Sequence, residues 1–308
     1  MSWAKGPVKW IEKRVVYISI PFTWNLPDVR SFLLQKSFMW DRAVVGGPAV
    51  YLMPDFFAGL QHVRIGRNMP GVLQHANPQA TRTTAGCPNK CGFCGVKRIN
   101  GDFVELEDWP DLPVLIDDNV FAASQQHFDK VIDRLSKHLQ PITKKGHTVD
   151  FNQGVDSRLL SEYHAERIAQ LKKPMLRLAL DSMAYADEWL KAVELLRSAG
   201  VAKGNIRSYA LVGFNSDPAE AWERCEFIEK HVDKVLPMWF HPLDALKSNQ
   251  VSITQKSFGW SNFERRRLME WYYKHKRLQA GVTKPCIRQN PPRKVAVRLS
   301  LVQGGFCW

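Results

Sequence analysis

The region from residue 81 to about residue 243 alternates short apolar runs with amphipathic stretches of helical periodicity. This alternation predicts βα units arranged around a parallel sheet. Strands are expected at about Ala80–Thr84, Val114–Ile116, Thr148–Asn152, Met175–Leu180, Ile206–Val212 and Lys234–Leu236. Helices are expected between them, at about Ser124–Leu139, Leu160–Leu171, Ala184–Ala199 and Pro218–Lys230. We therefore predict an α/β fold whose chemistry lies at the carboxyl ends of its strands.

Three cysteines follow the first predicted strand within eight residues: Cys87, Cys91 and Cys94. The spacing C-x3-C-x2-C supplies three thiolates on one short loop, and soft thiolate clusters select zinc or an iron–sulfur cluster. A structural zinc site needs a fourth ligand, usually from a second pair, and neither upstream histidine forms such a pair. A disulfide framework is disfavoured, because six cysteines in 308 residues is a low density.

The cysteine spacing, with the aromatic Phe93 directly before the last cysteine, resembles the signature of the radical S-adenosylmethionine (radical SAM) superfamily. The resemblance implies a 4Fe-4S cluster held by Cys87, Cys91 and Cys94, with one iron open to the amino and carboxylate groups of SAM. It also implies reductive cleavage of SAM and abstraction of hydrogen from a C–H bond by the 5′-deoxyadenosyl radical. For residues 80–245 it implies a partial (β/α)6 TIM-like barrel.

Polar residues at the ends of predicted strands are the candidates for contacts with SAM. The stretch Val-Leu-Ile-Asp-Asp-Asn resembles the second-strand motif of the methylthiotransferase-like and cobalamin-associated branches, whose acidic end contacts the SAM amino group. The matching positions are Asp117, Asp118 and Asn119. Asp181 and Ser182 resemble the fourth-strand position that holds the ribose hydroxyls. Capping of the next helix is the alternative in both cases, because Asp, Asn and Ser favour helix N-caps.

Further candidates follow the third and sixth predicted strands. Gln153 and Arg158 are candidates to face SAM or substrate, since a guanidinium can bind two carboxylate oxygens at once. A surface ion pair with Asp156 is the alternative for Arg158. Met238 and Trp239 have two possible roles, lining the substrate end or closing the core.

Residues 1–79 are predicted to form a small α/β extension. A strand is expected at Arg14–Ile20, a helix at about Asp28–Phe38 and a strand at Ala43–Val45. Segments 21–24 and 45–48 are similar to pieces of the cobalamin-binding domain that precedes many radical SAM cores. The extension is too short for the full doubly wound sheet, and the motif D-x-H-x-x-G is absent. We therefore predict a truncated relic of that domain, in which cobalamin is disfavoured.

The net charge of +13 is concentrated near the C-terminus, where residues 251–308 carry 12 basic and two acidic side chains. A helix from Ser261 to about Gln279 is predicted, in which aromatic and basic residues are interleaved, as suits phosphate neutralisation and base stacking. The candidate nucleic-acid residues are Arg265, Arg266, Arg267, Lys274, Lys276 and Arg277. The alternative is an amphipathic lid whose charges are simply solvated.

The expected organisation is the extension 1–79, the barrel 80–245 and a basic helical segment 246–308. We predict a radical SAM enzyme acting on a nucleic acid or nucleotide. The alternatives are the same chemistry on a small metabolite or peptide, and a non-catalytic iron–sulfur or zinc protein that binds nucleic acid. A flavodoxin or ferredoxin is the expected reductant. No apolar run approaches the ~20 residues of a membrane helix, so a cytoplasmic protein is expected. Cys225, Cys286 and Cys307 lack cluster spacing, which disfavours an auxiliary cluster.

Overall fold

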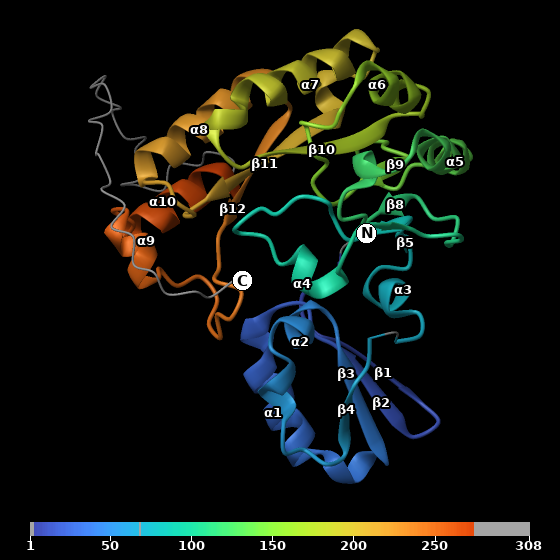
Figure 1. Cartoon of the computed structure of the whole chain (residues 1–308), viewed down its shortest axis with the longest axis vertical. Helices are drawn as coiled ribbons and strands as arrows, with labels where there is room; N and C mark the ends of the chain where they lie inside the picture. The colour runs from blue at the N-terminus through green and yellow to red at the C-terminus, as the bar shows by residue number, and fades with distance from the viewer. Residues whose placement is uncertain (1–2, 68, 274–308) are drawn as a thin grey trace. The chain divides into compact units, whose positions relative to one another are not determined.

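The computed structural model describes residues 3–67 and 69–273. All of them belong to one compact unit, residues 1–277, and the second unit, residues 278–308, lies outside the described part. Within that part, the largest sheet has six strands, all parallel, which neighbour one another in the order of the sequence (Figure 1). They are β5 (Ala80–Thr81), β8 (Val114–Leu115), β9 (Val149–Phe151), β10 (Pro174–Leu180), β11 (Ile206–Val212) and β12 (Lys234–Trp239). The predicted parallel α/β fold is therefore present.

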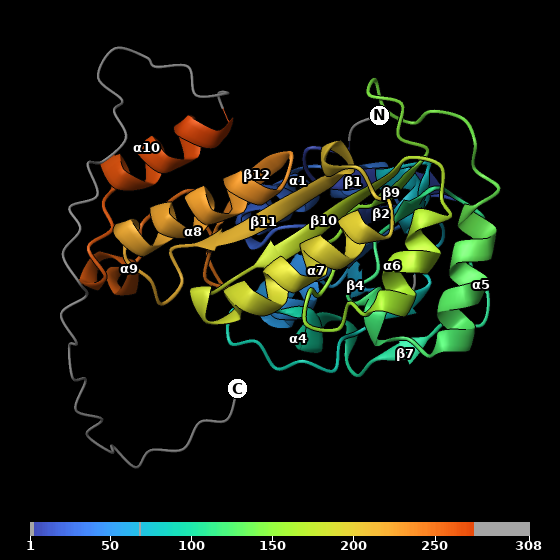
Figure 2. The same cartoon turned by 90° about the horizontal axis from the view of Figure 1, so that it is seen from above.

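Helices connect consecutive strands and lie along one face of this sheet (Figure 2). They are α5 (Gln125–Leu135), α6 (Glu162–Ala169), α7 (Ala186–Ser198) and α8 (Pro218–His231). One-sided placement follows from right-handed crossovers between parallel strands in sequential order. The helices bury Phe128, Trp189 and Trp222 against the sheet. Asp217 forms a capping box with Glu220 at the start of α8, as expected for Asp-Pro at a helix N-terminus. Closure into a (β/α)6 barrel stays a prediction.

The first two predicted strands are shorter than expected. After β5 the chain leaves the sheet and forms β6 (Thr84–Ala85), which pairs antiparallel with β7 (Val104–Glu105). Neither of these two-residue strands was predicted. The backbone N–H groups of Thr83 and Thr84 donate to the carboxylate of Asp117 instead of to a neighbouring strand. The ladder therefore ends at Thr81.

The N-terminal extension contains a four-stranded sheet in sequence order: β1 (Val8–Glu12), β2 (Val15–Ser19), β3 (Arg42–Gly46) and β4 (Val63–Ile65). β1 is antiparallel to β2, and the other pairs are parallel. The predicted helix and two strands correspond to α1 (Leu26–Gln35), β2 and β3, whereas β1 and β4 were missed. The extension has its own buried cluster, which includes Ile18, Leu33 and Val45. Its interpretation as a truncated cobalamin domain, and the boundary at residue 79, stay predictions.

Four helices of five residues each, the 12-residue helix α10 and several 3-10 turns complete the described structure. They are α2 (Pro48–Leu52), α3 (Val72–Ala76), α4 (Val96–Asn100), α9 (Ile253–Ser257) and α10 (Asn262–Tyr273), with 3-10 turns η1 (Thr23–Asn25), η2 (Ser37–Met39), η3 (Pro54–Phe57), η4 (Val120–Ala122), η5 (Met183–Tyr185) and η6 (Lys203–Asn205). α10 begins at the predicted place and buries Leu268 and Tyr272 in the same core as the parallel sheet. The predicted continuation to Gln279 lies outside the described residues. No helix among those described is both long and apolar enough to cross a membrane.

Candidate functional site

The three cysteines lie on the loop between β6 and α4, beyond the carboxyl end of β5. Cys87 and Cys91 are half-buried and Cys94 is exposed. Although the residue as a whole is exposed, protein atoms around its sulfur raise the pKa of the Cys94 thiol by desolvation, and the neighbouring thiols of Cys91 and Cys87 raise it further, so the three groups lie within electrostatic reach of one another. Among the described residues, no group of three or more His, Cys, Asp or Glu side chains is arranged to hold a metal ion. The donor set, three thiols on one loop, nevertheless has the chemistry that an iron–sulfur cluster requires.

Phe93 fixes this loop against the far strands of the parallel sheet. Its ring meets the ring of Phe214, beyond β11, edge to face at 5.6 Å between centroids. Phe214 in turn meets Phe240, beyond β12, at 4.9 Å. Aromatic pairs in this geometry contribute about 0.5–1.5 kcal/mol beyond their buried area. The aromatic of the cysteine motif therefore packs the loop in place, through partners that the sequence did not reveal.

Amide side chains connect the cysteine loop to the strand ends. Asn119 donates to Cys87 Sγ at 3.4 Å and to Asp156 Oδ2 at 3.3 Å. Asn89, within the cysteine loop, donates to the same Asp156 oxygen at 2.6 Å. Asn119 is buried, and its carbonyl oxygen has no partner among the described residues. The structure thus places this predicted SAM residue against a cysteine thiol.

Arg158 forms the ion pair that was one of its two predicted roles. Its Nε and Nη2 donate to the two carboxylate oxygens of Asp156 at 2.7 and 2.9 Å. Burial opposes ionisation of Asp156, but the hydrogen bonds and charge of Arg158 outweigh it and hold the pKa of Asp156 below its usual value. The hydrogen bonds to Asp156 raise the pKa of Arg158, and the nearby Cys91 thiol raises it further. Arg158 is therefore a fixed cation beside a cysteine of the loop.

The two adjacent aspartates after β8 have different surroundings. Asp117 is 5% exposed, and its Oδ1 accepts from the Thr83 N–H at 2.7 Å and from the hydroxyls of Thr83 and Thr84 at 3.0 and 2.9 Å. Burial raises the pKa of Asp117. Asp118 accepts from the N–H of Gly86, next to Cys87, at 2.8 Å. Asp117 therefore stabilises the segment after β5 through hydrogen bonds in the protein interior, whereas Asp118 lines a cavity.

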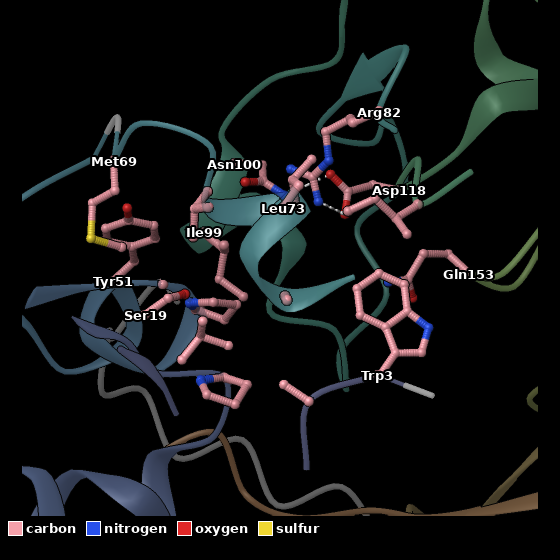
Figure 3. A pocket seen from close by; sticks show the side chains of 18 of the residues that line it. Trp3, Ser19, Tyr51, Met69, Leu73, Arg82, Ile99, Asn100, Asp118 and Gln153 are labelled. Atoms are coloured by element: carbon pink, nitrogen blue, oxygen red, sulfur yellow. Dashed lines mark hydrogen bonds and ion pairs between the residues drawn. The ribbon is translucent and has the colours of Figure 1, made fainter. Parts of the chain in front are cut away.

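The cavity has a volume of about 390 Å³, and its lining includes Arg82, which precedes the cysteine loop, and Ile99, which follows it (Figure 3). Strand ends of both sheets line it. Asp118 and Gln153 follow β8 and β9, while Ser19 ends β2 and Gly47 follows β3. Gly47 has a φ of +91°, and a Cβ there would lie 2.8 Å from the backbone nitrogen of Ile20, so the close approach of the two segments requires glycine. The predicted SAM residues are thus divided, with Asp118 and Gln153 at this cavity and the others outside its lining.

Asp181 and Ser182 directly follow β10 and have different surroundings. Ser182 Oγ accepts from the Ala184 N–H at 3.2 Å and caps η5, which is the alternative role foreseen for it. Asp181 has no hydrogen bond among the described residues. Burial raises the pKa of Asp181 to about 6, and the charges of Arg224 and Arg158 counteract part of that increase while Asp156 adds to it. Asp181 is therefore a partly buried carboxylate whose two oxygens can accept hydrogen bonds from a ligand.

If Asp181 accepts from the ribose hydroxyls of SAM, as the resemblance implies, the affinity for SAM should fall as the pH drops below about 6, the pKa of Asp181. Protonation removes the charge that favours bonds from two ribose hydroxyls, so the affinity should fall roughly tenfold per pH unit below that pKa. Asp181→Asn should bind SAM weakly throughout and show no dependence in this range. Isothermal titration of the cluster-loaded protein with SAM measures this, with Asp187→Asn, an exposed position on α7, as the control. A wild-type profile retained by Asp181→Asn would contradict the assignment.

The described arginines of the predicted nucleic-acid segment mostly contact their own chain. Arg265 donates to Asn249 Oδ1 at 3.3 Å, and burial lowers the pKa of Arg265. Arg267 lies 3.4 Å from Glu264, and its guanidinium lies 6.0 Å from the Trp222 ring centroid. Arg266 is exposed. Lys274, Lys276 and Arg277 lie outside the described residues, so the nucleic-acid interface stays a prediction.

Trp239 has one of its two predicted roles, whereas the substrate-lining role of Met238 stays a prediction. Trp239 is buried, packs against Trp260 at 4.9 Å between ring centroids and donates to the Gln250 carbonyl, so it closes the core. Met238 is 47% exposed and therefore does not close the core.

No family model and no curated protein matches the chain by sequence. Solved structures of TsrM, a radical SAM methyltransferase from Kitasatospora setae, are similar to it with a TM-score of 0.53. In the TsrM structure with tryptophan substrate and the SAM analog aza-SAM, the match has 12% identity and covers 74% of this chain and 62% of TsrM. In the structure with cobalamin and a [4Fe-4S] cluster, it has 11% identity and covers 76% and 66%. The fold is shared with a radical SAM enzyme. This chain spans less than two-thirds of TsrM, and at this identity the likeness shows the fold alone.

Proposed function

We propose that this protein is a radical SAM enzyme. The observation that carries the proposal is the position of the C-x3-C-x2-C loop, beyond the carboxyl end of the first strand of a parallel sheet whose fold is similar to that of a radical SAM methyltransferase. Parallel α/β sheets place their ligands at that edge. The proposal includes the partial (β/α)6 barrel geometry for the six parallel strands and a cytoplasmic location.

Cys87, Cys91 and Cys94 would hold a 4Fe-4S cluster. When bound there, the cluster supplies one electron that divides SAM into methionine and a 5′-deoxyadenosyl radical, which takes a hydrogen atom from a substrate carbon and leaves a substrate radical. The electron would come from a flavodoxin or ferredoxin. Asn119 donates to the sulfur of Cys87, and the guanidinium of Arg158 lies near Cys91, so both would stabilise thiolate charge. Asp181 would accept from the ribose hydroxyls of SAM.

Two substrate classes are proposed. A nucleic acid or nucleotide is supported by the charge of residues 251–308, where basic side chains outnumber acidic ones by 12 to 2. A small molecule is favoured by a specific observation, the cavity of about 390 Å³ beside the cysteine loop. Cavities of a few hundred cubic ångströms are typical of small-molecule sites.

Formation of 5′-deoxyadenosine tests the enzymatic proposal. The protein is loaded with iron and sulfide under anaerobic conditions and then given dithionite and SAM. We expect methionine and 5′-deoxyadenosine in equal amounts, measured by chromatography with mass detection. Reactions without dithionite, and with protein kept free of iron, should form neither product. A protein that carries a complete cluster and forms no 5′-deoxyadenosine would contradict the proposed function.

A further inference from the structure

We propose that the cavity beside the cysteine loop binds a small organic anion, a molecule with an apolar body and a carboxylate group that is bound by Arg82. This names the substrate class of the proposed enzyme, and it rests on the proposed function only in calling that molecule a substrate. Binding itself can be measured whether or not SAM is cleaved.

The walls of the cavity determine the body of the ligand. At about 390 Å³, the cavity suits a molecule of drug-like size or smaller. Most of the side chains that line it are apolar, and they come from both sheets and their helices. They include Trp3, Pro21, Met69, Leu73, Ile99 and Ile116. A flat, apolar ligand would bury its surface here at about 25 cal/mol per Å².

Arg82 determines the charge of the ligand. Its side chain is 24% exposed, its Nε is buried, and Nε has no hydrogen-bond partner among the described residues. Nη2 lies 3.9 Å from Asp118 Oδ1, which is too long for a hydrogen bond (Figure 3). The other oxygen of Asp118 already accepts from Gly86 and from Asn100 at 2.6 Å. A ligand carboxylate in the cavity could bind the terminal nitrogens of this guanidinium, which form no hydrogen bond among the described residues.

Arg67 adds positive charge to the same cavity. It lines the cavity and forms no ion pair within the described residues, and its guanidinium lies 5.3 Å from the Tyr51 ring centroid. The Tyr51 hydroxyl donates to the carbonyls of Gly66 and Arg67 at 2.9 and 3.0 Å, which holds this segment at the rim. The lining therefore carries two arginines against the single carboxylate of Asp118. This balance favours an anion over a cation.

The position of the cavity suits a substrate of the proposed radical chemistry. Asp118 receives the N–H of Gly86, the residue before Cys87. On the other side of the cysteine loop, Ile99 and Asn100 of α4 line the cavity and follow Cys94 within six residues. A ligand bound there would thus lie beside the loop that carries all three cysteine ligands.

Cobalamin, which is bound in one TsrM structure, does not fit this cavity. A corrin ring with its side chains and nucleotide loop is several times larger than the molecules that such a volume holds. No histidine is found among the described residues that line it, so no imidazole is placed to bind cobalt from below. Cobalamin therefore has no part in the proposed reaction.

Three naphthalenes with the same apolar body test the proposal: 2-naphthoate, 2-naphthamide and 2-naphthylmethylammonium. Their affinities for the full-length, cluster-loaded protein are measured by isothermal titration. We expect 2-naphthoate to bind at least tenfold more tightly than the other two. Arg82→Gln should weaken 2-naphthoate about tenfold and leave 2-naphthamide unchanged. Arg64→Gln, on the exposed face of β4 and outside the lining, is the matched control. Ile99→Trp should fill the cavity and weaken all three, and if it fails to fold, the Arg82 comparison still decides.

Several results would overturn the proposal. Equal affinity for the three probes would remove the role of Arg82. Competition between SAM and 2-naphthoate would make the cavity the SAM site, and competition by a single-stranded RNA would assign it to nucleic acid. Retention of one equivalent of hydroxocobalamin would also overturn it. If no 5′-deoxyadenosine forms but Arg82→Gln still weakens 2-naphthoate, only the enzymatic proposal fails. If 5′-deoxyadenosine forms and no probe binds, only the cavity proposal fails.

Discussion

Cys91→Ala is expected to abolish both the visible absorbance of the reconstituted protein and the formation of 5′-deoxyadenosine from SAM. Two remaining thiols cannot hold a cube that three ligands hold. Product formation should fall by more than about 100-fold, the largest loss typical of changing only a residue that supports a metal ligand. Iron and sulfide analysis together with product chromatography measure this.

The matched control is another cysteine. Cys225 is fully buried in the core between α8 and the parallel sheet, and it lies on no motif with cluster spacing. Burial raises the pKa of its thiol to about 12, so it remains neutral and inert as a ligand. Cys225→Ala should keep iron, sulfide and product formation at the level of the unmodified protein. Full iron content and activity in Cys91→Ala, or bound zinc in the unmodified protein, would contradict the cluster assignment.

The long strands could be predicted from the sequence because their signal is local. Ile206–Val212 was predicted with both of its ends, since the segment Ile-Arg-Ser-Tyr-Ala-Leu-Val ends directly before Gly213. β6 and β7 have two residues each, too few to show any periodicity, and they form because Asp117 draws Thr83 and Thr84 out of the sheet. β1 was missed for a related reason, because it is mostly exposed and lacks apolar alternation.

The residues of the candidate site also divide into those with a local sequence signal and those that only the fold brings together. The three cysteines were identified by their spacing, which is a property of eight consecutive residues. Asn89 and Asp156 are 67 positions apart, and only the fold brings their side chains within 2.6 Å. Arg82 was overlooked because a single arginine after a short strand carries no pattern, although its unpaired donors are evident once the cavity walls are known. Contacts between polar side chains that are distant in the sequence therefore could not be predicted from the sequence.

Asp117→Ala is expected to destabilise the protein strongly, by about 2–5 kcal/mol of unfolding free energy. The substitution leaves the backbone N–H groups of Thr83 and Thr84 buried without an acceptor, and each such group costs about 1–3 kcal/mol. Because these residues connect β5 to the cysteine loop, the loop should lose order as well. Urea unfolding followed by circular dichroism, at the same protein concentration for each variant, measures the change.

Asp117→Asn separates this supporting role from a direct contact with SAM. Asparagine keeps the Oδ1 acceptor, and its amide nitrogen takes the place of Oδ2, which is buried and has no partner among the described residues. We therefore expect Asp117→Asn to lose less than half as much stability as Asp117→Ala and to keep the cluster and its affinity for SAM. If the carboxylate contacted the SAM ammonium, Asp117→Asn would keep most of its stability and its cluster and yet bind SAM weakly. That outcome would return Asp117 to the ligand-binding residues.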